Sequence, residues 1–521
     1  MTSTPATVAP SLPFLFRFGD DGRFYAEDVP VAELARAHGT PLHVISKNQL
    51  LANLHALQRG LRSGWPGETR VLPAIKSNTS FALCAILSRE TPGCDLFSEG
   101  ELEAALRGGF DPACLSLNGN SKLGSDTELL RVAIAKGVRI TLDDALELEP
   151  IEAIARDLGR RATIRLRVRV SLPNVNAPTD FPVHGPLPVD IAAQAYKAGI
   201  PFEDLLAVGR RALASPHVDL AGLHLHLGRH RRELEFWRES MAAYARLIAT
   251  LVREWNGWEP REIDLGGGFA QHLDPFVGYA DEHATDGQLR ALSRLLKAAG
   301  LFGNAARYRL ASLLLRRERA KLLSRPGPDL TCSAAPSAEE YAEASARALR
   351  DALAAEGIDA AGKLLEIEPG RALFGSAAIH LTRVSFIKRQ THPLPWTWVV
   401  TDTSEVWLQG GGHGPGRHPR VVDGKPIERY APSDRTVADI AGKSCGPDQI
   451  IGDACLPGDL EAGDHLVLVG TGAYQEMMSS NFNSMPRPAT VLVDGAEHAL
   501  IRRRETLADV FDREVGLAAA D

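Results

Sequence analysis

The chain has 521 residues, of which 44% are hydrophobic and 24% charged, as in globular proteins that bury a sizeable core. Lysine and arginine number 58 and aspartate and glutamate 65, and the net charge of -7 gives no basis for a nucleic-acid partner or an anionic membrane surface. Six scattered cysteines without a CxxC pair argue against a zinc site or a disulfide framework. Without a long apolar run or a signal-like start, the chain is expected to be cytoplasmic.

Residues 13–47 contain two strand-like pieces, FLFRF and PLHVI, around a helix-like segment. From residue 48 to about 265, short apolar runs alternate with amphipathic helical segments, as in EGELEAALRGG followed by CLSLNG. This order requires parallel strands joined by helical crossovers, and the number of units predicts an α/β fold with a (β/α)8 barrel. In ATIRLRVRV, Arg165, Arg167 and Arg169 alternate with apolar residues. We expect these arginines to point into the barrel or toward its mouth, although an edge strand with a wet face would show the same pattern.

Two regions depart from this rhythm. Residues 272–345 hold helix-like segments and a loop-like stretch, and we predict a helical insertion on the barrel there. After residue 375 strand and turn patterns dominate, as in HLTRVSFIKRQ, TWVVTD and DHLVLVG. The predicted domains are therefore a barrel at 48–375 and a mostly β domain at 376–521, with which the N-terminal strands of 1–47 pack.

Residues 71–80, VLPAIKSNTS, form a short apolar run that closes in polar residues, as a buried strand does where it enters a loop. The run presents one amine, that of Lys76. Such a lysine is either a surface charge at a strand end or a buried amine with a lowered pKa, able to form an imine with a carbonyl compound. Groups at other strand ends favour the second interpretation.

Two later strand ends carry groups that suit a flat, phosphorylated ligand. GLHLHLG places His224 and His226 two apart on one strand face, but no nearby carboxylate or cysteine completes a metal site. We therefore expect no metal and favour an imidazole that lies flat over a planar ring. IDLGGGF places Gly266, Gly267 and Gly268 after a strand, where backbone N–H groups can approach a phosphate, although a tight turn would use the same glycines.

LLEIEPGRALFG sets Glu368 and Arg371 at a further strand end. The carboxylate can pair with a ring nitrogen and the guanidinium can bind a phosphate through two hydrogen bonds, while a surface ion pair is the alternative. A lysine imine, a flat ring contact, a glycine phosphate cradle and a carboxylate for a pyridine nitrogen together meet the needs of pyridoxal phosphate.

With these residues the sequence resembles a known family, the fold type III pyridoxal-phosphate decarboxylases, which include diaminopimelate and ornithine decarboxylases. The resemblance covers most of the chain outside the insertion, as motifs in a fixed order: AIKSN at Lys76, CDLFSEGE around Asp95, GNSK at 119–122, TLDD at 141–144, KAGIP at 197–201, HLHLG at 224–228, GGGF, EPGR, SCGPD at 444–448 and GAYQEMMSSNFN at 472–483. It implies a (β/α)8 barrel with a second, mostly β domain, and an amino-acid decarboxylase that binds pyridoxal phosphate and works as a homodimer.

The resemblance also implies roles for single residues. Lys76 would form the Schiff base with the cofactor, His226 would stack on its ring, and Glu368 would keep the pyridine nitrogen protonated. Gly267, Gly268, Arg371 and Tyr474 would bind the phosphate. The further cofactor-binding residues expected are Asp95, Arg167, Arg229, Gly266 and Gly370. A racemase on this barrel generally has an arginine opposite the ring nitrogen, so the glutamate of EPGR favours decarboxylation.

In this family the site is completed across the dimer, and Cys445 of SCGPD would come from the other subunit to protonate the carbanion left by CO2. A thiol is a plausible proton donor near neutral pH. Cys455, in GDACLPGD, is the rival. In the family the cysteine is followed by an aspartate and then by an LP…GD segment. Cys445 is preferred because Asp448 and the later LPGDLEAGD follow it in this order, although the spacing from Cys445 to Asp448 is one residue shorter than usual.

Three departures from the family pattern concern the substrate. Arg229 replaces the serine that usually follows HxHxG, and it could bind phosphate, reach an anionic substrate or be a solvated charge. Gly446 replaces the glutamate that, in diaminopimelate decarboxylases, recognises the distal amine. The segment LQGGGHGPGRH, with Arg417 and His418, replaces the arginine-proline segment that binds the distal carboxylate. The residues expected at the substrate are Cys445, Gly446, Asp448, Arg417, His418 and Tyr474.

These departures argue against diaminopimelate and favour a basic or diamino acid, or a conjugated derivative such as the acylated ornithine or lysine of siderophore pathways. Diaminopimelate decarboxylation and racemisation stay as alternatives. A third alternative is a non-catalytic homologue that binds the cofactor or regulates a partner, which the presence of Lys76, Glu368 and a cysteine disfavours.

Overall fold

The computed structural model describes residues 14–120, 122–123, 127–169, 197–227, 233–270, 336–392, 394–408, 420–422 and 424–516, with single residues between 309 and 323. These residues form two compact units. One unit takes the described residues of Met1–Gln49 and Ser376–Asp521, and the other takes those of Leu50–His272 and Ala335–Gly375. Most of the insertion predicted at about 272–345 lies outside the described residues.

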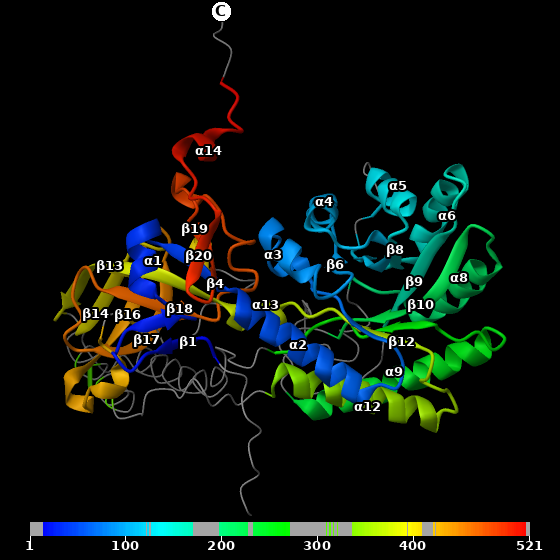
Figure 1. Ribbon diagram of the computed structural model, residues 1–521, viewed down its shortest axis with the longest axis horizontal. Coiled ribbons are helices and arrows are strands. Elements are labelled where there is room, and N and C mark those ends of the chain that lie inside the picture. The colour runs from blue at the N-terminus through cyan, green and yellow to red at the C-terminus, as the bar shows by residue number, and fades with distance from the viewer. Residues whose placement is uncertain are drawn as a thin grey trace, which may run out of the picture. The chain divides into compact units, whose positions relative to one another are not determined.

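The unit that contains Lys76 is built on eight parallel strands in the order β5-β12-β11-β10-β9-β8-β7-β6 (Figure 1). Their bounds are β5 (Thr69–Val71), β6 (Asp95–Leu96), β7 (Ser116–Leu117), β8 (Arg139–Leu142), β9 (Ala162–Val168), β10 (Val218–Leu225), β11 (Glu262–Asp264) and β12 (Leu364–Ile367). Ala74 forms a parallel bridge with Asp95, and the Asp95 N–H donates to the carbonyl oxygen of Pro73 at 3.1 Å. The two ends of the strand order therefore meet, which confirms the predicted (β/α)8 barrel.

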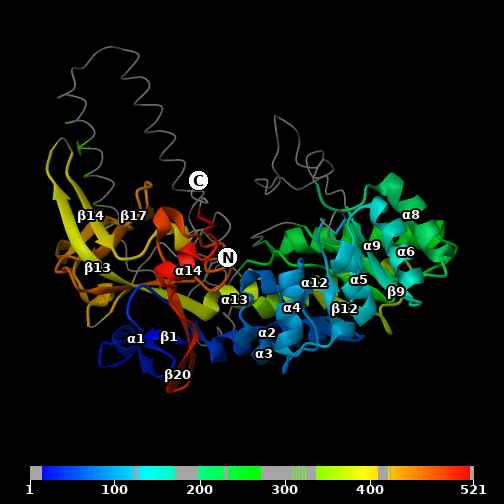
Figure 2. The ribbon, with the colours of Figure 1, turned by 90° about the horizontal axis from the view of Figure 1, so that it is seen from above.

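Helices cover the outside of these strands (Figures 1 and 2). They are α2 (Lys47–Gly64), α3 (Phe81–Leu87), α4 (Glu99–Gly108), α5 (Thr127–Lys136), α6 (Leu148–Asp157), α8 (Phe202–Ala214), α9 (Leu234–Glu254), α12 (Ala338–Ala355) and α13 (Arg371–Phe374). A capping box between Ser337 and Glu340 starts α12. Gly60 and Gly64 let α2 approach α12 closely. A Cβ at Gly60 would lie 2.3 Å from the carbonyl oxygen of Glu339, and one at Gly64 would lie 2.7 Å from that of Glu343.

The other unit is mostly β (Figure 1). A nine-stranded sheet contains the path β17-β16-β14-β13-β4-β19-β20, and β15 pairs with β18, which pairs with β13. The N-terminal strand β4 (Leu42–Ser46) lies between β13 and β19, antiparallel to the first and parallel to the second. The remaining bounds are β13 (Ala378–Gln390), β14 (Trp396–Thr401), β15 (Arg420–Val421), β16 (Arg435–Ala441), β17 (Gln449–Pro457), β18 (His465–Val469), β19 (Ala489–Asp494), β20 (Glu497–Arg502) and α14 (Leu507–Phe511).

A small sheet of β1 (Phe16–Phe18), β2 (Phe24–Ala26) and β3 (Val29–Pro30), with helix α1 (Val31–His38), belongs to the same unit. Phe16, Phe24 and Leu34 share a buried core with Leu42 of β4 and Ile379 of β13. This arrangement confirms the prediction that N-terminal strands join the C-terminal β domain. Within the described stretches, no helix is both long enough and apolar enough to span a lipid bilayer.

Candidate active site

Lys76 lies on a single 3₁₀ turn, η1 (Ile75–Ser77), which follows β5 at the carboxyl end of the barrel strands. The strand itself ends at Val71, earlier than predicted, although backbone pairing continues past Pro73, where the Ala74 N–H donates to the carbonyl oxygen of Pro369 at 3.2 Å. The Lys76 side chain is 32% exposed, and its Nζ donates to Oδ2 of the fully buried Asp95 at 2.5 Å. The face of the Phe97 ring lies 4.4 Å from the same nitrogen. The amine is thus partly buried beside a carboxylate.

Hydrogen bonds lead from Asp95 to Glu368. Asp95 Oδ1 accepts from Asn118 Nδ2 at 2.6 Å, and the same nitrogen donates to Glu368 Oε1 at 2.6 Å. The hydroxyl of Ser116 donates to that Glu368 oxygen at 3.1 Å. Ser116 and Asn118 are two apart at the end of β7, so they share the inward face of the strand. Lys76 and Glu368 are therefore joined by one buried polar network.

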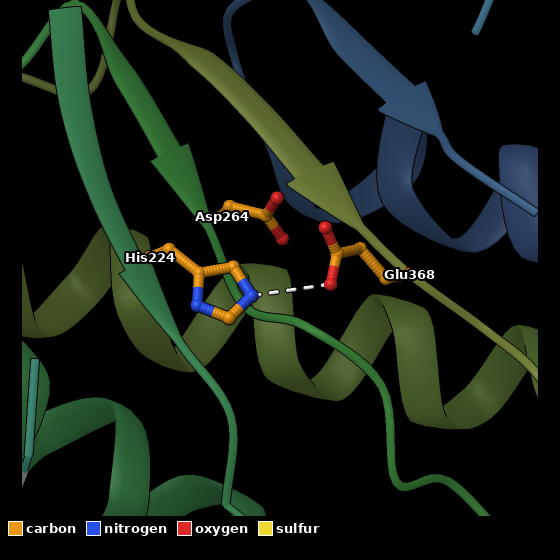
Figure 3. A group of neighbouring side chains, drawn as sticks. All are labelled: His224, Asp264 and Glu368. Carbon is orange, nitrogen blue, oxygen red and sulfur yellow. Dashed lines mark hydrogen bonds and ion pairs between the residues drawn. The ribbon is translucent and has the colours of Figure 1, made fainter. Parts of the chain in front are cut away.

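Glu368 follows β12, and its other oxygen faces a histidine. His224, on β10, lies 3.1 Å from Glu368 Oε2 through its Nε2, and Asp264, on β11, points at the same place (Figure 3). One ligand atom from each of the three side chains lies within 4.8 Å of the others. The prediction that no carboxylate stands near His224 was wrong, because the strand order places β10, β11 and β12 side by side.

These three residue types could hold a metal ion, but a cation already neutralises the group. Arg165 NH1 lies 2.9 Å from Asp264 Oδ2, and its side chain is completely buried. A divalent ion at this position would meet the guanidinium charge in a medium of low polarity. The residues therefore suit the sharing of protons better than metal binding, and the expectation of no metal stays a prediction.

Burial sets the charge states of this cluster. It lowers the pKa of His224 to about 3, so the imidazole is neutral and donates its Nε2 proton to an ionised Glu368. Burial, together with the charge of Asp95, raises the pKa of Glu368 to about 7. Burial and the nearby Glu368 raise the pKa of Asp264 to about 8. Near neutral pH the two carboxyls therefore gain or lose protons as a pair.

Arg165 lies beneath this cluster and crosses the barrel interior. It pairs with Glu366 of β12 at 2.5 Å as well as with Asp264, and it donates to Ser116. Arg139 of β8 donates to the same Glu366 oxygen at 2.8 Å. Burial alone would raise the pKa of Glu366, but Arg139 and Arg165 lower it below its ordinary value. Arg165 therefore points inward, as the alternation in its strand predicts.

The three glycines form the turn after β11. Gly266 has φ +63°, and a Cβ there would lie 2.5 Å from the carbonyl oxygen of Leu225, so only glycine fits without movement. A Cβ at Gly267 would lie 2.3 Å from the carbonyl oxygen of Glu368. The Gly266 N–H donates to Asp264 Oδ1 at 2.8 Å, and the Gly267 N–H donates to His226 Nδ1 at 3.3 Å. Of the three glycines, Gly266 thus uses its N–H to fix Asp264.

Two arginines predicted at the cofactor are also buried. Arg167, two residues after Arg165, donates to Asp143 Oδ1 at 2.9 Å. Arg371 begins α13 directly after Gly370, whose backbone has φ -97° and ψ -82°. Because the Glu368 N–H donates to the Gly266 carbonyl oxygen at 2.8 Å, the EPGR and GGG segments are neighbours. The cofactor-binding roles of these residues stay predictions.

The other unit contains the loop of Cys445. The Cys445 N–H donates to Asn483 Oδ1 at 2.9 Å, and Asn483 Nδ2 donates to Cys445 Sγ at 3.1 Å. Asp448, which is 2% exposed, accepts from the backbone N–H groups of Glu405 at 2.6 Å and Ser444 at 2.5 Å. Asp448 thus holds the two ends of this loop together. Cys445 itself is exposed.

Glu405 is a residue that the sequence analysis missed. Its Oε1 lies 3.6 Å from the place where a Cβ at Gly446 would be, so a carboxylate stands beside the residue after Cys445. No lysine, arginine or histidine in the described part of this unit forms an ion pair with it. Tyr474 has φ +69° and is half-buried. Arg229, Arg417 and His418 lie outside the described residues.

The barrel residues fit pyridoxal phosphate. One hydrogen-bonded network joins the partly buried amine of Lys76 to the buried carboxylate of Glu368. The amine could hold the aldehyde of the cofactor, and the carboxylate could pair with the ring nitrogen of the same ligand. In the glycine turn beside them, a side chain at Gly266 or Gly267 would meet the backbone. Sequence reasoning found Lys76, Asp95, Glu368 and the glycines, but it did not single out Ser116, Asn118, Asp264 or Glu366. For Asp264 the signal was present, because this aspartate ends a strand two residues before the first of the three glycines.

Comparison with known proteins agrees with this chemistry. Residues 48–285 match the family described as "Pyridoxal-dependent decarboxylase, pyridoxal binding domain". A diaminopimelate decarboxylase of Vibrio cholerae is 28% identical over 96% of this chain and 98% of its own length, and one of Pseudomonas aeruginosa is 28% identical over 95% and 97%.

Solved structures share the fold. Diaminopimelate decarboxylase from M. jannaschii matches with a TM-score of 0.75 at 22% identity, covering 96% of this chain and 98% of that one. Lysine decarboxylase from Selenomonas ruminantium matches with a TM-score of 0.60 at 18% identity, covering 90% and 97%.

Proposed function

Because the chain belongs to the fold type III pyridoxal-phosphate-dependent decarboxylase family, we propose that it removes the α-carboxylate of a basic or diamino acid, or of a conjugated derivative of one. The chain is thus an enzyme of the carboxy-lyase class. The observation that carries the assignment of residues is the hydrogen-bonded link from Lys76 through Asp95 and Asn118 to Glu368.

Pyridoxal phosphate, when bound, supplies an electron sink for the electron pair that departing CO2 leaves behind. Lys76 would hold the cofactor's aldehyde carbon, with Asp95 as the partner of its amine. Glu368 would hold a proton at the ring nitrogen, and the donors Ser116, Asn118 and His224 keep its carboxylate oriented. A carboxylate at this position, where a racemase on the same scaffold generally has an arginine, favours decarboxylation over racemisation.

The proton that replaces CO2 would come from Cys445. Cys445 is an exposed residue whose sulfur accepts a hydrogen bond from Asn483, so its thiol is oriented and open to a ligand. Cys455 lies within β17, where it faces Val437 of β16, and burial raises the pKa of its thiol. We therefore keep Cys445 as the donor.

Replacing the two cysteines separately tests this assignment. Cys445→Ser should lower kcat by about 10²-fold or more, because a serine hydroxyl is a far weaker acid than a thiol. Cys455→Ser is the matched control and should stay within about twofold of the parent, as substitutions outside a site do. The measurement is CO2 release with saturating substrate. A large loss in Cys455→Ser with little loss in Cys445→Ser would reverse the assignment.

The substrate class rests on Glu405 and on the relatives. The Glu405 carboxylate lies beside Gly446, the residue after Cys445, and it could form an ion pair with a cationic group at the far end of the substrate. Diaminopimelate has such a group, and relatives matched over nearly their full length carry that name, so it is the second candidate and the first compound to assay. A panel of diaminopimelate, ornithine, lysine, their acylated derivatives and glutamate tests the proposal by CO2 release. Activity on glutamate alone, or on none of the panel, would refute it.

Glu405→Gln should raise KM for the active basic substrate by about tenfold or more while kcat changes little, because a hydrogen bond to a charged group contributes about 1.5–3 kcal/mol. The matched control is Glu497→Gln, a neutralised carboxylate at an exposed position on β20 of the same unit. Steady-state kinetics distinguish the two variants. Equal KM values for Glu405→Gln and the parent would exclude Glu405 from substrate recognition.

A homodimer that completes the site, with Cys445 facing the cofactor of the other subunit, and a cytoplasmic location stay predictions. They follow from the family resemblance and from the sequence, respectively.

A further inference from the structure

We propose that Asn118 is a positioning residue that couples the two ends of the cofactor site, holding the carboxylate beside Lys76 and the carboxylate of Glu368 on the two hydrogens of one amide group. This inference rests on the proposed function of Lys76 and Glu368. The amide nitrogen lies 2.6 Å from Asp95 Oδ1 and 2.6 Å from Glu368 Oε1. Its third contact, to Ser116 Oγ, is longer, at 3.3 Å.

The orientation of the amide follows from its neighbours. Two carboxylate oxygens at this distance need donors, so the nitrogen, and not the oxygen, must face them. An NH2 group has two hydrogens, one for each carboxylate. The Asn118 oxygen is buried and makes no hydrogen bond with any described residue. This arrangement leaves an acceptor unpaired in order to place both donors, which indicates that the donors have the larger effect on the site.

The backbone holds Asn118 in this place. Its N–H donates to the carbonyl oxygen of Leu96 on β6 at 2.9 Å, and its side chain is 2% exposed. Gly119 follows with φ +104°, and a Cβ there would lie 2.8 Å from the Phe97 ring. The chain therefore turns away directly after Asn118, and the backbone that carries the amide is fixed on both sides.

The amide matters because many charges face Glu368. The charged groups are Lys76 of η1, Asp95 of β6 and Arg165 of β9. The other titratable neighbours are the neutral His224 of β10, Asp264 of β11 and, on β12 itself, Glu366. Of these, Asp95 is a like charge that raises the pKa of Glu368 and so opposes its ionisation, whereas Asp264 lowers that pKa through a hydrogen bond. An amide donor shared with Asp95 lets both carboxylates stay ionised side by side. Without it, we expect Glu368 to take up a proton at higher pH.

Three variants of Asn118 test this role. Asn118→Leu keeps the shape and removes both donors, Asn118→Asp replaces the donors by a third carboxylate, and Asn118→Ser keeps one donor. For each, the affinity of the apo-protein for pyridoxal phosphate is measured between pH 5.5 and 9. Wild type should show a rise in affinity as Glu368 ionises. We expect this rise to move to higher pH by about one unit in Asn118→Leu, further in Asn118→Asp and least in Asn118→Ser.

Asn53→Leu is the matched control. Asn53 is another buried asparagine of the barrel unit, and its Nδ2 donates to the carbonyl oxygen of Leu373 at 2.8 Å. It should lower the melting temperature and leave the pH of the affinity rise unchanged. Folded Asn118 variants that keep the wild-type pH dependence would overturn the inference. Wild-type protein that binds no pyridoxal phosphate at all would overturn the proposed function instead, so the two failures are distinguishable.

Discussion

Lys76→Ala should lose cofactor-dependent CO2 release by about 10³-fold or more, because no other group in the network can form a covalent bond to the aldehyde. The substitution also leaves Asp95 buried without its cation, at 0% exposure. Apo-protein mixed with pyridoxal phosphate should then lack the absorbance near the visible edge that a lysine-bound aldehyde gives. Absorbance and CO2 release are the two measurements.

Lys363→Ala is the control for Lys76→Ala. Lys363 is a largely buried lysine of the same unit, paired with Glu259 at 2.6 Å, but it precedes β12 and so lies at the opposite end of that strand from Glu368. Its loss should affect stability while absorbance and activity are retained. If Lys76→Ala kept the absorbance band and Lys363→Ala lost it, the cofactor would bind at the end of the barrel where Lys363 lies, opposite to Glu368.

Glu368→Gln should lower kcat/KM by about 10²–10³-fold, as the loss of a group that stabilises developing charge does in other enzymes. The amide cannot stabilise a proton on the ring nitrogen as a carboxylate does. Its NH2 group would also face the donors of Asn118, Ser116 and His224, which now have one acceptor fewer. Glu262→Gln is the matched control, since Glu262 starts β11 and pairs with Arg139.

The affinity for pyridoxal phosphate should depend on pH in the direction set by the raised pKa of Glu368. Burial raises the pKa of this carboxyl to about 7, so it is protonated below that pH and ionised above it. Pairing with a protonated ring nitrogen requires the ionised form. The affinity of the wild-type apo-protein for pyridoxal phosphate should therefore increase by about tenfold from pH 6 to pH 8, and most of this increase should vanish in Glu368→Gln. An unchanged pH profile in the variant would show that another group is responsible.

The barrel and its mouth could be predicted from the sequence because they follow from short-range patterns. Apolar runs in alternation with amphipathic segments dictated the parallel strands, and the alternation in β9 dictated which way Arg165 points. Lys76 and Glu368 could be found because each follows an apolar run, where such strands place their functional groups. The predicted length of β5 was wrong, since the strand ends at Val71 and only single backbone pairs continue through Pro73 and Ala74.

Contacts across the barrel could not be predicted in the same way. Which strand lies beside which is a property of the closed sheet, so the sequence did not reveal that Asp264 and Glu368 meet His224. Asn118 directly precedes the family motif GNSK at 119–122 and was not part of it. The role of its donors becomes visible only once β6, β7 and β12 bring Asp95 and Glu368 to it. Glu405 lies beside Gly446 because its backbone N–H donates to Asp448, which belongs to the same loop as Gly446. The two residues are far apart in the sequence, and no local pattern predicts their contact.

Reductive trapping of the cofactor tests the central claim most directly. Borohydride added to the protein after loading with pyridoxal phosphate fixes the aldehyde carbon to whichever amine holds it, and peptide mapping by mass spectrometry then identifies that residue. The structure predicts a single labelled site, Lys76, next to Asp95. A label on another lysine, or no label in folded protein that binds the cofactor, would contradict the account.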